Sequence, residues 1–329
     1  MISSCDLMDG TKRSFESVAV EDVIANSNLA QAVEYSYVAE GHERHKLDFY
    51  KYSGDTEVKR PTLIWIHGGA WVAGDKLSID PIAYQIAGLG KYNLISVNYR
   101  LANDDTAPWP EIVYDVNAAI RWIKLNSDKL GIDPDKLVLA GESAGAHLAA
   151  MAAFSHDIEE LSGDKNPGVS TDVRAVVLFY GAYNMTSLVV QKNSSIRSGM
   201  CEQPQYSSPI LELLDCPMTK KAGYNIDSCD LKKIRTADPC AYVDKSDPPA
   251  FLAHGHDDCI VPWAQSKALH DELEDAGVKN VFVSVEDGEH RVSTLDIEPK
   301  EVVGFIQGSL VEKKESISDA DVSPVPDKQ

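Results

Sequence analysis

The amino-acid sequence predicts an α/β fold, with a mostly parallel central sheet covered by helices on both faces. The first observation is that short apolar runs alternate with segments of helical periodicity along most of the 329 residues. The second is that two apolar runs end in glycine-rich breaks, 62-TLIWIHGGAWVAGDK-76 and 137-LVLAGESAGAHLAAMAAF-154. The third is that no apolar run approaches the roughly 20 residues required to cross a bilayer, so no membrane span is expected.

Each expected element follows from its local pattern. Residues 34–38 and 46–52 alternate apolar and polar side chains, and without a helix between them they should form an antiparallel edge. Buried strands are expected at 62–67, 93–99, 137–140, 174–181, 249–255 and 280–286. Helices are expected at 110–130 (opened by Pro110 and closed by Gly131), 143–154, 263–276 and 297–311, with a weaker helical pattern over 15–32.

The expected domain organisation is a single α/β domain over residues 1–311. Residues 183–245 interrupt the alternation with cysteine, asparagine, serine, lysine and proline. We interpret them as an irregular insertion or partial lid rather than a second domain. Residues 312–329 are polar and contain proline, so this tail is expected to be disordered.

Charge narrows the choice of partner. Acidic residues outnumber basic ones by 51 to 31, which gives a net charge of −20. Such a surface repels phosphate backbones and anionic lipids, so nucleic acids and membrane surfaces are disfavoured. The charge is expected to serve solubility, and steering of a cationic substrate is the less favoured interpretation. A small-molecule substrate is the expected partner, and the sequence leaves the oligomeric state open.

The cysteines suggest an oxidising compartment. Six are present, at Cys5, Cys201, Cys216, Cys229, Cys240 and Cys259. Their wide spacing, without a C-x-x-C pair, disfavours a zinc site and favours two local disulfides of open connectivity. The alternative is reduced, packed cysteines in the cytosol. The N-terminal residues lack the apolar segment of a secretory signal. A secreted or periplasmic location is expected, with a cytoplasmic location as the alternative.

The segment GESAG predicts a nucleophile. It follows an apolar strand pattern and precedes an alanine-rich helix, which is the context of a nucleophile elbow. Gly141 and Gly145 permit the tight turn, and Ser143 is then exposed at its tip. The alternative is a plain strand-to-helix turn in which the serine caps the helix.

A serine nucleophile needs a base, and in this arrangement the chain order is serine, acid, histidine. His270 lies in a charged helical run and is expected to be a solvated surface residue. His290 lies in a loop just after the last expected strand, where such sheets build their sites. His290 is therefore the expected base.

The acid is expected in the loop after the preceding strand, 254-HGHDDCIVP-262. Asp258 is the preferred residue to accept the N–H of His290, with Asp257 as the second choice. His254 and His256 are expected to shape this loop rather than to react.

The segment HGGAW predicts an oxyanion hole. The glycines let the backbone approach a substrate, and the N–H groups of Gly69 and Ala70 are expected to point inward together with that of Ala144. His67 and the segment 98–102 are expected to hold this loop in place.

Two further residues are candidates for substrate binding. Trp71 is expected to form a wall of the acyl or alcohol pocket, with an ordinary core aromatic as the alternative. Glu142 is expected to hydrogen-bond near the elbow without a catalytic role.

With HGGAW, NYRL, GESAG, HGHDDCIVP and GEH in this order, the chain resembles the α/β-hydrolase esterases over roughly residues 45–310. It is most similar to the hormone-sensitive-lipase-like carboxylesterases and the bacterial feruloyl and acetyl esterase group. The resemblance implies a Ser143, Asp258 and His290 triad. Ala70 departs from the usual third glycine of the oxyanion loop, and Glu142 stands where lipase-like members have aspartate.

This resemblance implies a serine carboxylesterase that acts on short-chain or aryl esters through an acyl-enzyme. Acetyl or feruloyl esters of plant polysaccharides are the specific expectation. The alternatives are an arylformamidase-type amide hydrolase and, less favoured, a non-catalytic ligand-binding protein. The retained His290 argues against the last of these. No metal or organic cofactor is implied.

Overall fold

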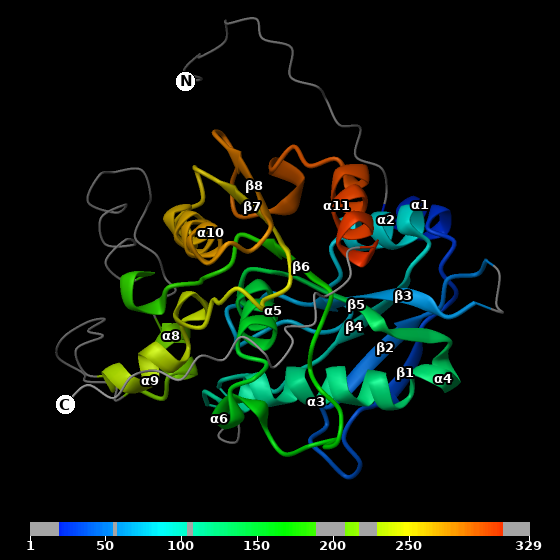
Figure 1. Cartoon of the computed structure of the whole chain (residues 1–329), viewed down its shortest axis with the longest axis horizontal. Coiled ribbons are helices and arrows are strands. Elements are labelled where there is room, and N and C mark those ends of the chain that lie inside the picture. Colours follow the sequence, from blue (N-terminus) through cyan, green and yellow to red (C-terminus); the bar gives the residue numbers. More distant parts are fainter. Residues whose placement is uncertain (1–19, 55–57, 104–107, 189–207, 217–228, 312–329) are drawn as a thin grey trace, which may run out of the picture.

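The computed structural model describes residues 20–54, 58–103, 108–188, 208–216 and 229–311. Its centre is an eight-stranded sheet of order β1-β2-β4-β3-β5-β6-β7-β8 (Figure 1). The strands are β1 Val33–Ser36, β2 Lys46–Tyr50, β3 Arg60–Ile66, β4 Asn93–Val97, β5 Ile132–Glu142, β6 Ala175–Phe179, β7 Ala250–Gly255 and β8 Asn280–Val285. The β1–β2 and β2–β4 pairs are antiparallel and all later pairs are parallel.

Helices cover both faces of this sheet (Figure 1). One face carries α1 Val20–Asn26, α2 Pro81–Gly90 and α11 Pro299–Val311. The other carries α3 Glu111–Leu125, α5 Ala144–Phe154, α6 Glu159–Ser162, α8 Ser208–Leu213, α9 Leu231–Thr236 and α10 Ala264–Ala276. Shorter pieces are α4 Ser127–Leu130, η2 Pro239–Ala241 and η3 Val292–Thr294. The sheet order, the two covered faces and the edge of β1 and β2 confirm the predicted α/β fold.

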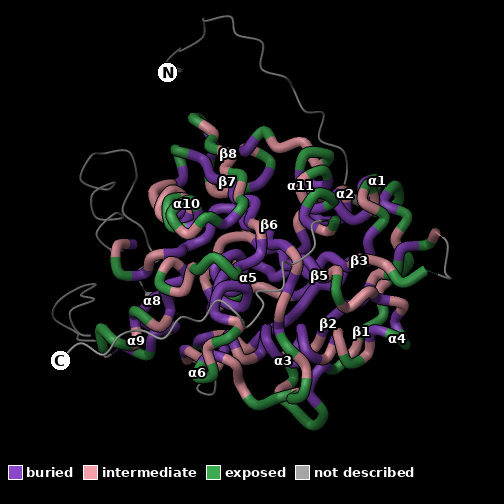
Figure 2. Tube along the Cα trace, viewed as in Figure 1, coloured by how far each residue is buried: buried purple, intermediate pink, exposed green. Residues whose placement is uncertain are grey.

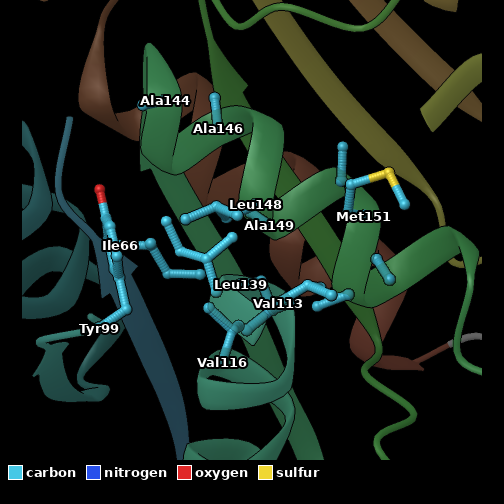
Figure 3. Close-up of a cluster of buried hydrophobic side chains, with 14 of the residues drawn as sticks. Ile66, Tyr99, Val113, Val116, Leu139, Ala144, Ala146, Leu148, Ala149 and Met151 are labelled. Carbon is cyan, nitrogen blue, oxygen red and sulfur yellow. The ribbon is translucent and has the colours of Figure 1, made fainter. Parts of the chain in front are cut away.

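The central strands are buried because side chains on both sheet faces meet helices. Every residue of β4 and β6 is buried, whereas the edge strand β8 is only partly covered (Figure 2). The alanine-rich α5 is buried along its whole length. Its small side chains let the helix lie close to the sheet, where Leu148 and Ala149 lie near Leu139 of β5 and Val113 of α3 (Figure 3).

Element ends differ slightly from the sequence-based expectation. The helix expected at 110–130 is divided into α3 and α4, because the chain leaves helical geometry at Asn126. Gly131 closes α4 with φ +69°, a conformation that glycine adopts at no steric cost. Among the described residues no helix is long and apolar enough to cross a membrane.

Candidate active site

The turn between β5 and α5 places Ser143 in an unusual backbone conformation. Its φ is +52° and its ψ is −121°, which a non-glycine residue rarely adopts. The Ser143 amide donates to the Phe179 carbonyl oxygen at 2.9 Å, which ties the turn to β6. A Cβ on Gly145 would lie 2.0 Å from the Ile66 carbonyl oxygen, so only glycine permits this approach of the helix to β3.

Three residues predicted from separate parts of the sequence meet at this turn. The Nε2 of His290 lies 2.9 Å from the Oγ of Ser143. The Nδ1 of the same ring lies 2.6 Å from the Oδ2 of Asp258. Asp258 follows β7 and His290 follows β8, so the C-terminal ends of parallel strands bring them beside the elbow. We call Ser143, His290 and Asp258 the candidate triad.

Asp258 is buried and fully hydrogen-bonded. Its Oδ1 accepts from the amides of Ile260 and Val261, each at 2.8 Å. Its Oδ2 accepts from His290 and, at 3.1 Å, from the Nε2 of His254. Burial raises the pKa of Asp258, but the histidine hydrogen bonds outweigh it and hold the pKa well below its usual range. The side chain is therefore a carboxylate that can orient His290.

The competing residues lie elsewhere. Asp257 is exposed, and Asp258 contacts His290 in its place. His270 lies on α10 with its Nδ1 2.6 Å from the Oδ1 of Asn280, and its ring packs on Phe282. His270 is partly exposed at the surface, on the side of α10 that contacts β8.

The segment after β3 offers unpaired backbone donors. Gly69 has φ +114°, and a Cβ there would lie 2.2 Å from the Ala73 carbonyl oxygen. Within the described part of the chain, the N–H groups of Gly69, Ala70 and Ala144 donate to no protein acceptor. All three residues line one cavity together with Ser143. The arrangement can therefore stabilise an oxyanion formed at Ser143.

The expected support of this loop by residues 98–102 is confirmed. The Tyr99 hydroxyl donates to the His67 carbonyl oxygen at 2.8 Å, and the two rings stack with centroids 4.3 Å apart. The Ala102 amide donates to the Trp71 carbonyl oxygen at 2.8 Å. Burial lowers the pKa of His67 to about 4, so its ring is neutral at physiological pH.

Arg44 is a further support that the sequence did not reveal. Its guanidinium donates to the carbonyl oxygens of Tyr99 and Gly74, each at 2.8 Å. It therefore links the segment after β4 to the end of the glycine-rich loop after β3, residues 67–74, which we call the oxyanion loop. The turn at 41–45 carries no sequence signal for this role, because both acceptors are backbone groups far along the chain.

Trp71 both lines the cavity and is buried in the core, so the two interpretations of this residue are compatible. Its Nε1 donates to the Nδ1 of His147 at 3.0 Å. The His147 Nε2 in turn lies 2.9 Å from the Ala237 carbonyl oxygen. Burial lowers the pKa of His147 to about 4, so this neutral ring connects the oxyanion loop to the segment before β7.

Glu142 lies beside the elbow as expected. The Tyr180 hydroxyl donates to its Oε2 at 2.5 Å, and burial raises the pKa of Glu142. The Tyr180 ring centroid lies 4.5 Å from that of His290. Tyr180 thus packs between the elbow and the candidate base, a position that nothing in the sequence indicated.

The cavity at Ser143 has a volume of about 480 Å³. Part of its wall is apolar and comes from the predicted insertion, through Leu188, Pro209 and Ile210. Ile260 and Val261 from the loop after β7 continue this wall. The insertion therefore borders the cavity in which a substrate would bind.

The cysteines are partly paired. Cys216 and Cys229 form a disulfide, and Cys259 is also disulfide-bonded. Cys240 is free, and burial raises the pKa of its thiol. Cys5 and Cys201 lie outside the described residues. Within the described ranges, no group of three or more histidine, cysteine or acidic side chains is arranged to hold a metal ion.

The chain is similar to known esterases. The BD-FAE family model matches residues 47–273. The chain is 33% identical to the esterase LipQ of Mycobacterium tuberculosis over 257 residues, which are 77% of this chain and 55% of LipQ. It is 27% identical to the isoprenylcysteine alpha-carbonyl methylesterase ICME of Arabidopsis thaliana, over 78% of this chain and 56% of that protein. The chain thus spans about half the length of these curated relatives.

Solved structures show the same architecture. A truncated carbohydrate esterase from gut microbiota superposes with a TM-score of 0.73 at 25% identity, covering 87% of this chain and 98% of that one. A bifunctional GH43-CE protein of Bacteroides eggerthii gives 0.70 at 26%, covering 86% and 38%.

The eight-stranded sheet and the turn between β5 and α5 give the protein the α/β-hydrolase fold that it shares with a solved carbohydrate esterase. Within that class, because the family model matches more than half of the chain, the protein belongs to the BD-FAE family.

Proposed function

We propose that the protein is a serine carboxylesterase that hydrolyses short-chain or aryl esters through an acyl-enzyme. The observation that carries this proposal is the unbroken line of contacts from the Ser143 hydroxyl through His290 to the buried carboxylate of Asp258. The unpaired amides of Gly69, Ala70 and Ala144 support it, because they lie in the same cavity.

In the proposed mechanism, the Nε2 of His290 takes the proton of Ser143 as the Oγ attacks the ester carbonyl carbon. The carbonyl oxygen becomes an oxyanion, which the three amides stabilise. The tetrahedral intermediate then collapses, the alcohol leaves with the proton from His290, and an acyl-Ser143 ester remains. Water, deprotonated by His290, attacks this ester and releases the carboxylic acid and free Ser143. Asp258 holds the ring in the required tautomer throughout.

The proposed substrates are short or aromatic esters, including acetyl or feruloyl esters of plant polysaccharides. The limited cavity volume and its apolar wall favour a compact acyl or aryl group over a long chain. The similarity to a carbohydrate esterase and to a GH43-CE protein supports esters carried on a sugar. Trp71 and Glu142 are the proposed binding residues, because both line the cavity.

We also propose that residues 1–311 act as one domain in which residues 183–245 form a partial lid. The support is that Leu188, Pro209 and Ile210 of this insertion line the cavity beside Ser143. The expected tail at 312–329 lies outside the described residues.

Initial rates on p-nitrophenyl acetate, butyrate, octanoate and palmitate test this function, with wild type beside Ser143→Ala. Rates that fall with chain length and vanish in Ser143→Ala are expected. The same rates in both proteins would contradict the proposal. A folded wild type that cleaves no ester but hydrolyses an N-formyl arylamine would replace it with the formamidase alternative.

A further inference from the structure

A second histidine contacts the acid of the candidate triad. His254 belongs to β7 and is completely buried. Its Nε2 lies 3.1 Å from the Oδ2 of Asp258 and 2.8 Å from the Val261 carbonyl oxygen. Its Nδ1 lies 2.7 Å from the Oγ of Ser266 on α10. The ring is therefore held from both sides between β7, the acid loop and α10.

The partners of this ring fix its tautomer. A carboxylate and a carbonyl oxygen only accept hydrogen bonds, so the Nε2 of His254 must carry a hydrogen. In the neutral ring the Nδ1 then accepts from the hydroxyl of Ser266. Ser266 is itself completely buried, so this contact is shielded from competing water.

The oxygen that His254 contacts is the one that serves His290. The Oδ2 of Asp258 receives both histidines, while Oδ1 receives the amides of Ile260 and Val261. With donors on both oxygens, the carboxylate is fixed in its plane and cannot rotate. The N–H of His254 contributes to this by holding Oδ2 from a buried position, whereas His290 contacts the same oxygen from the cavity wall.

We propose that His254 is a positioning residue for the reaction of Ser143. With Ser266 behind it, His254 holds the Asp258 carboxylate in the orientation that aims His290 at the Ser143 hydroxyl. This inference rests on the proposed esterase function. It adds two buried residues to the machinery, so that the line of contacts runs from Ser266 through His254, Asp258 and His290 to Ser143.

The two rings on Asp258 have different consequences for the reaction. His290 lines the cavity and exchanges a proton with the reacting groups in each cycle. His254 is completely buried and does not line the cavity, so it acts only through geometry. Loss of its N–H should therefore lower kcat and leave substrate binding, and so KM, nearly unchanged.

The test compares His254→Leu with His254→Gln. Leucine fills the space without a donor, whereas glutamine offers an amide N–H near the position of Nε2. Because a small misalignment of reacting groups costs about 100-fold, His254→Leu should lower kcat about 10- to 100-fold with KM within about twofold. His254→Gln should recover most of that loss. The low-field proton resonance of the hydrogen bond between His290 and Asp258 should weaken in the leucine variant and return in the glutamine variant.

His256→Ala is the matched control. His256 follows β7 two residues after His254, but it contacts the Ser284 hydroxyl and the Trp263 ring instead of Asp258. Its removal should leave kcat within about threefold. Should His254→Leu fail to fold, Ser266→Ala replaces it, and a drop of about 3- to 10-fold in kcat at constant KM is expected.

Two results would overturn the inference. One is a His254→Leu or Ser266→Ala enzyme with wild-type kcat. The other is a loss of kcat in His254→Leu that His254→Gln does not recover and that comes with an equally large rise in KM. Ser143→Ala, assayed in parallel, separates this failure from a failure of the esterase proposal, because full activity in Ser143→Ala would remove the function itself.

Discussion

The elbow and the insertion contribute to the same cavity but are built differently. At the elbow, backbone atoms contact backbone atoms, and every residue of α5 is buried. The described part of the insertion contains short helices, among them α8, α9 and η2, held by a few apolar side chains and the disulfide between Cys216 and Cys229. The difference indicates that the position of the reacting groups is fixed by the sheet, while the shape of the cavity depends on a segment that sequence change can remodel.

The largest expected effect on kcat concerns the reacting groups at the elbow. His290→Ala removes the base that contacts Ser143, and kcat should fall by about 10⁴-fold or more. The fold should persist, because His290 lies in a loop at the edge of the cavity. Steady-state kinetics on p-nitrophenyl butyrate, with circular dichroism as the check on folding, measures both.

His270→Ala is its control. This ring contacts Asn280 away from the cavity, so kcat should remain near the wild-type value. A loss of activity in His270→Ala, with His290→Ala unaffected, would show that the base was assigned to the wrong histidine.

Gly145→Ala tests the backbone contacts of the elbow. The added Cβ would lie 2.0 Å from the Ile66 carbonyl oxygen, so β3 and α5 would have to separate. We expect a loss of about 3 kcal/mol or more in the free energy of unfolding. Gly304→Ala on α11 is the matched control, because a Cβ there meets no atom within 4 Å. Equal melting temperatures for the two variants would refute the claim that the elbow is rigidly packed.

Removal of the disulfide between Cys216 and Cys229 tests how the insertion is held together. Replacing Cys216 and Cys229 with serine opens a link across 13 residues, and about 3 kcal/mol of local stability should be lost. Hydrogen exchange should accelerate in α8 and α9 but not in α5. The control is Cys240→Ala, which removes a cysteine that is in no disulfide. Equal acceleration in α5 would mean that the two regions unfold together.

The smallest expected effect is on specificity. Ile210 is part of the apolar wall of the cavity, so the smaller side chain in Ile210→Ala enlarges the cavity. The ratio of the octanoate rate to the acetate rate should therefore rise several-fold, while the acetate rate stays near wild type. Leu231→Ala, an exposed residue of the same insertion, should leave the ratio unchanged. An unchanged ratio in Ile210→Ala would show that this part of the insertion does not determine which acyl chain lengths the enzyme accepts.

The sequence predicted those features in which residue type is tied to local backbone geometry. The positive φ of Ser143 and the close approach at Gly145 require the GESAG pattern, and the strands before the loops of Asp258 and His290 carry clear apolar runs. The order of the sheet then brings these loops together.

The residues that sequence reasoning missed act through long-range contacts. Tyr180 reaches Glu142 only because β5 and β6 pair in a particular register, and Arg44 reaches carbonyl oxygens that carry no side-chain signal. His147 also gave no sequence signal, because its partners Trp71 and Ala237 lie on other elements. His254 was expected to shape the loop after β7, but its contact with Ser266 on α10 was not foreseen. Periodicity also failed in the insertion, whose described residues form the short helices α8 and α9 and the disulfide between Cys216 and Cys229.

The backbone at Ser143 also limits which nucleophile the scaffold accepts. A side chain branched at Cβ is strongly disfavoured at positive φ, so threonine is excluded even though its hydroxyl has the same chemistry. Serine and cysteine each place one heavy atom on Cβ and fit the turn. Evolution within this architecture can therefore replace serine with cysteine at the tip of the elbow. Threonine, a secondary alcohol, would first require a turn with a different backbone conformation.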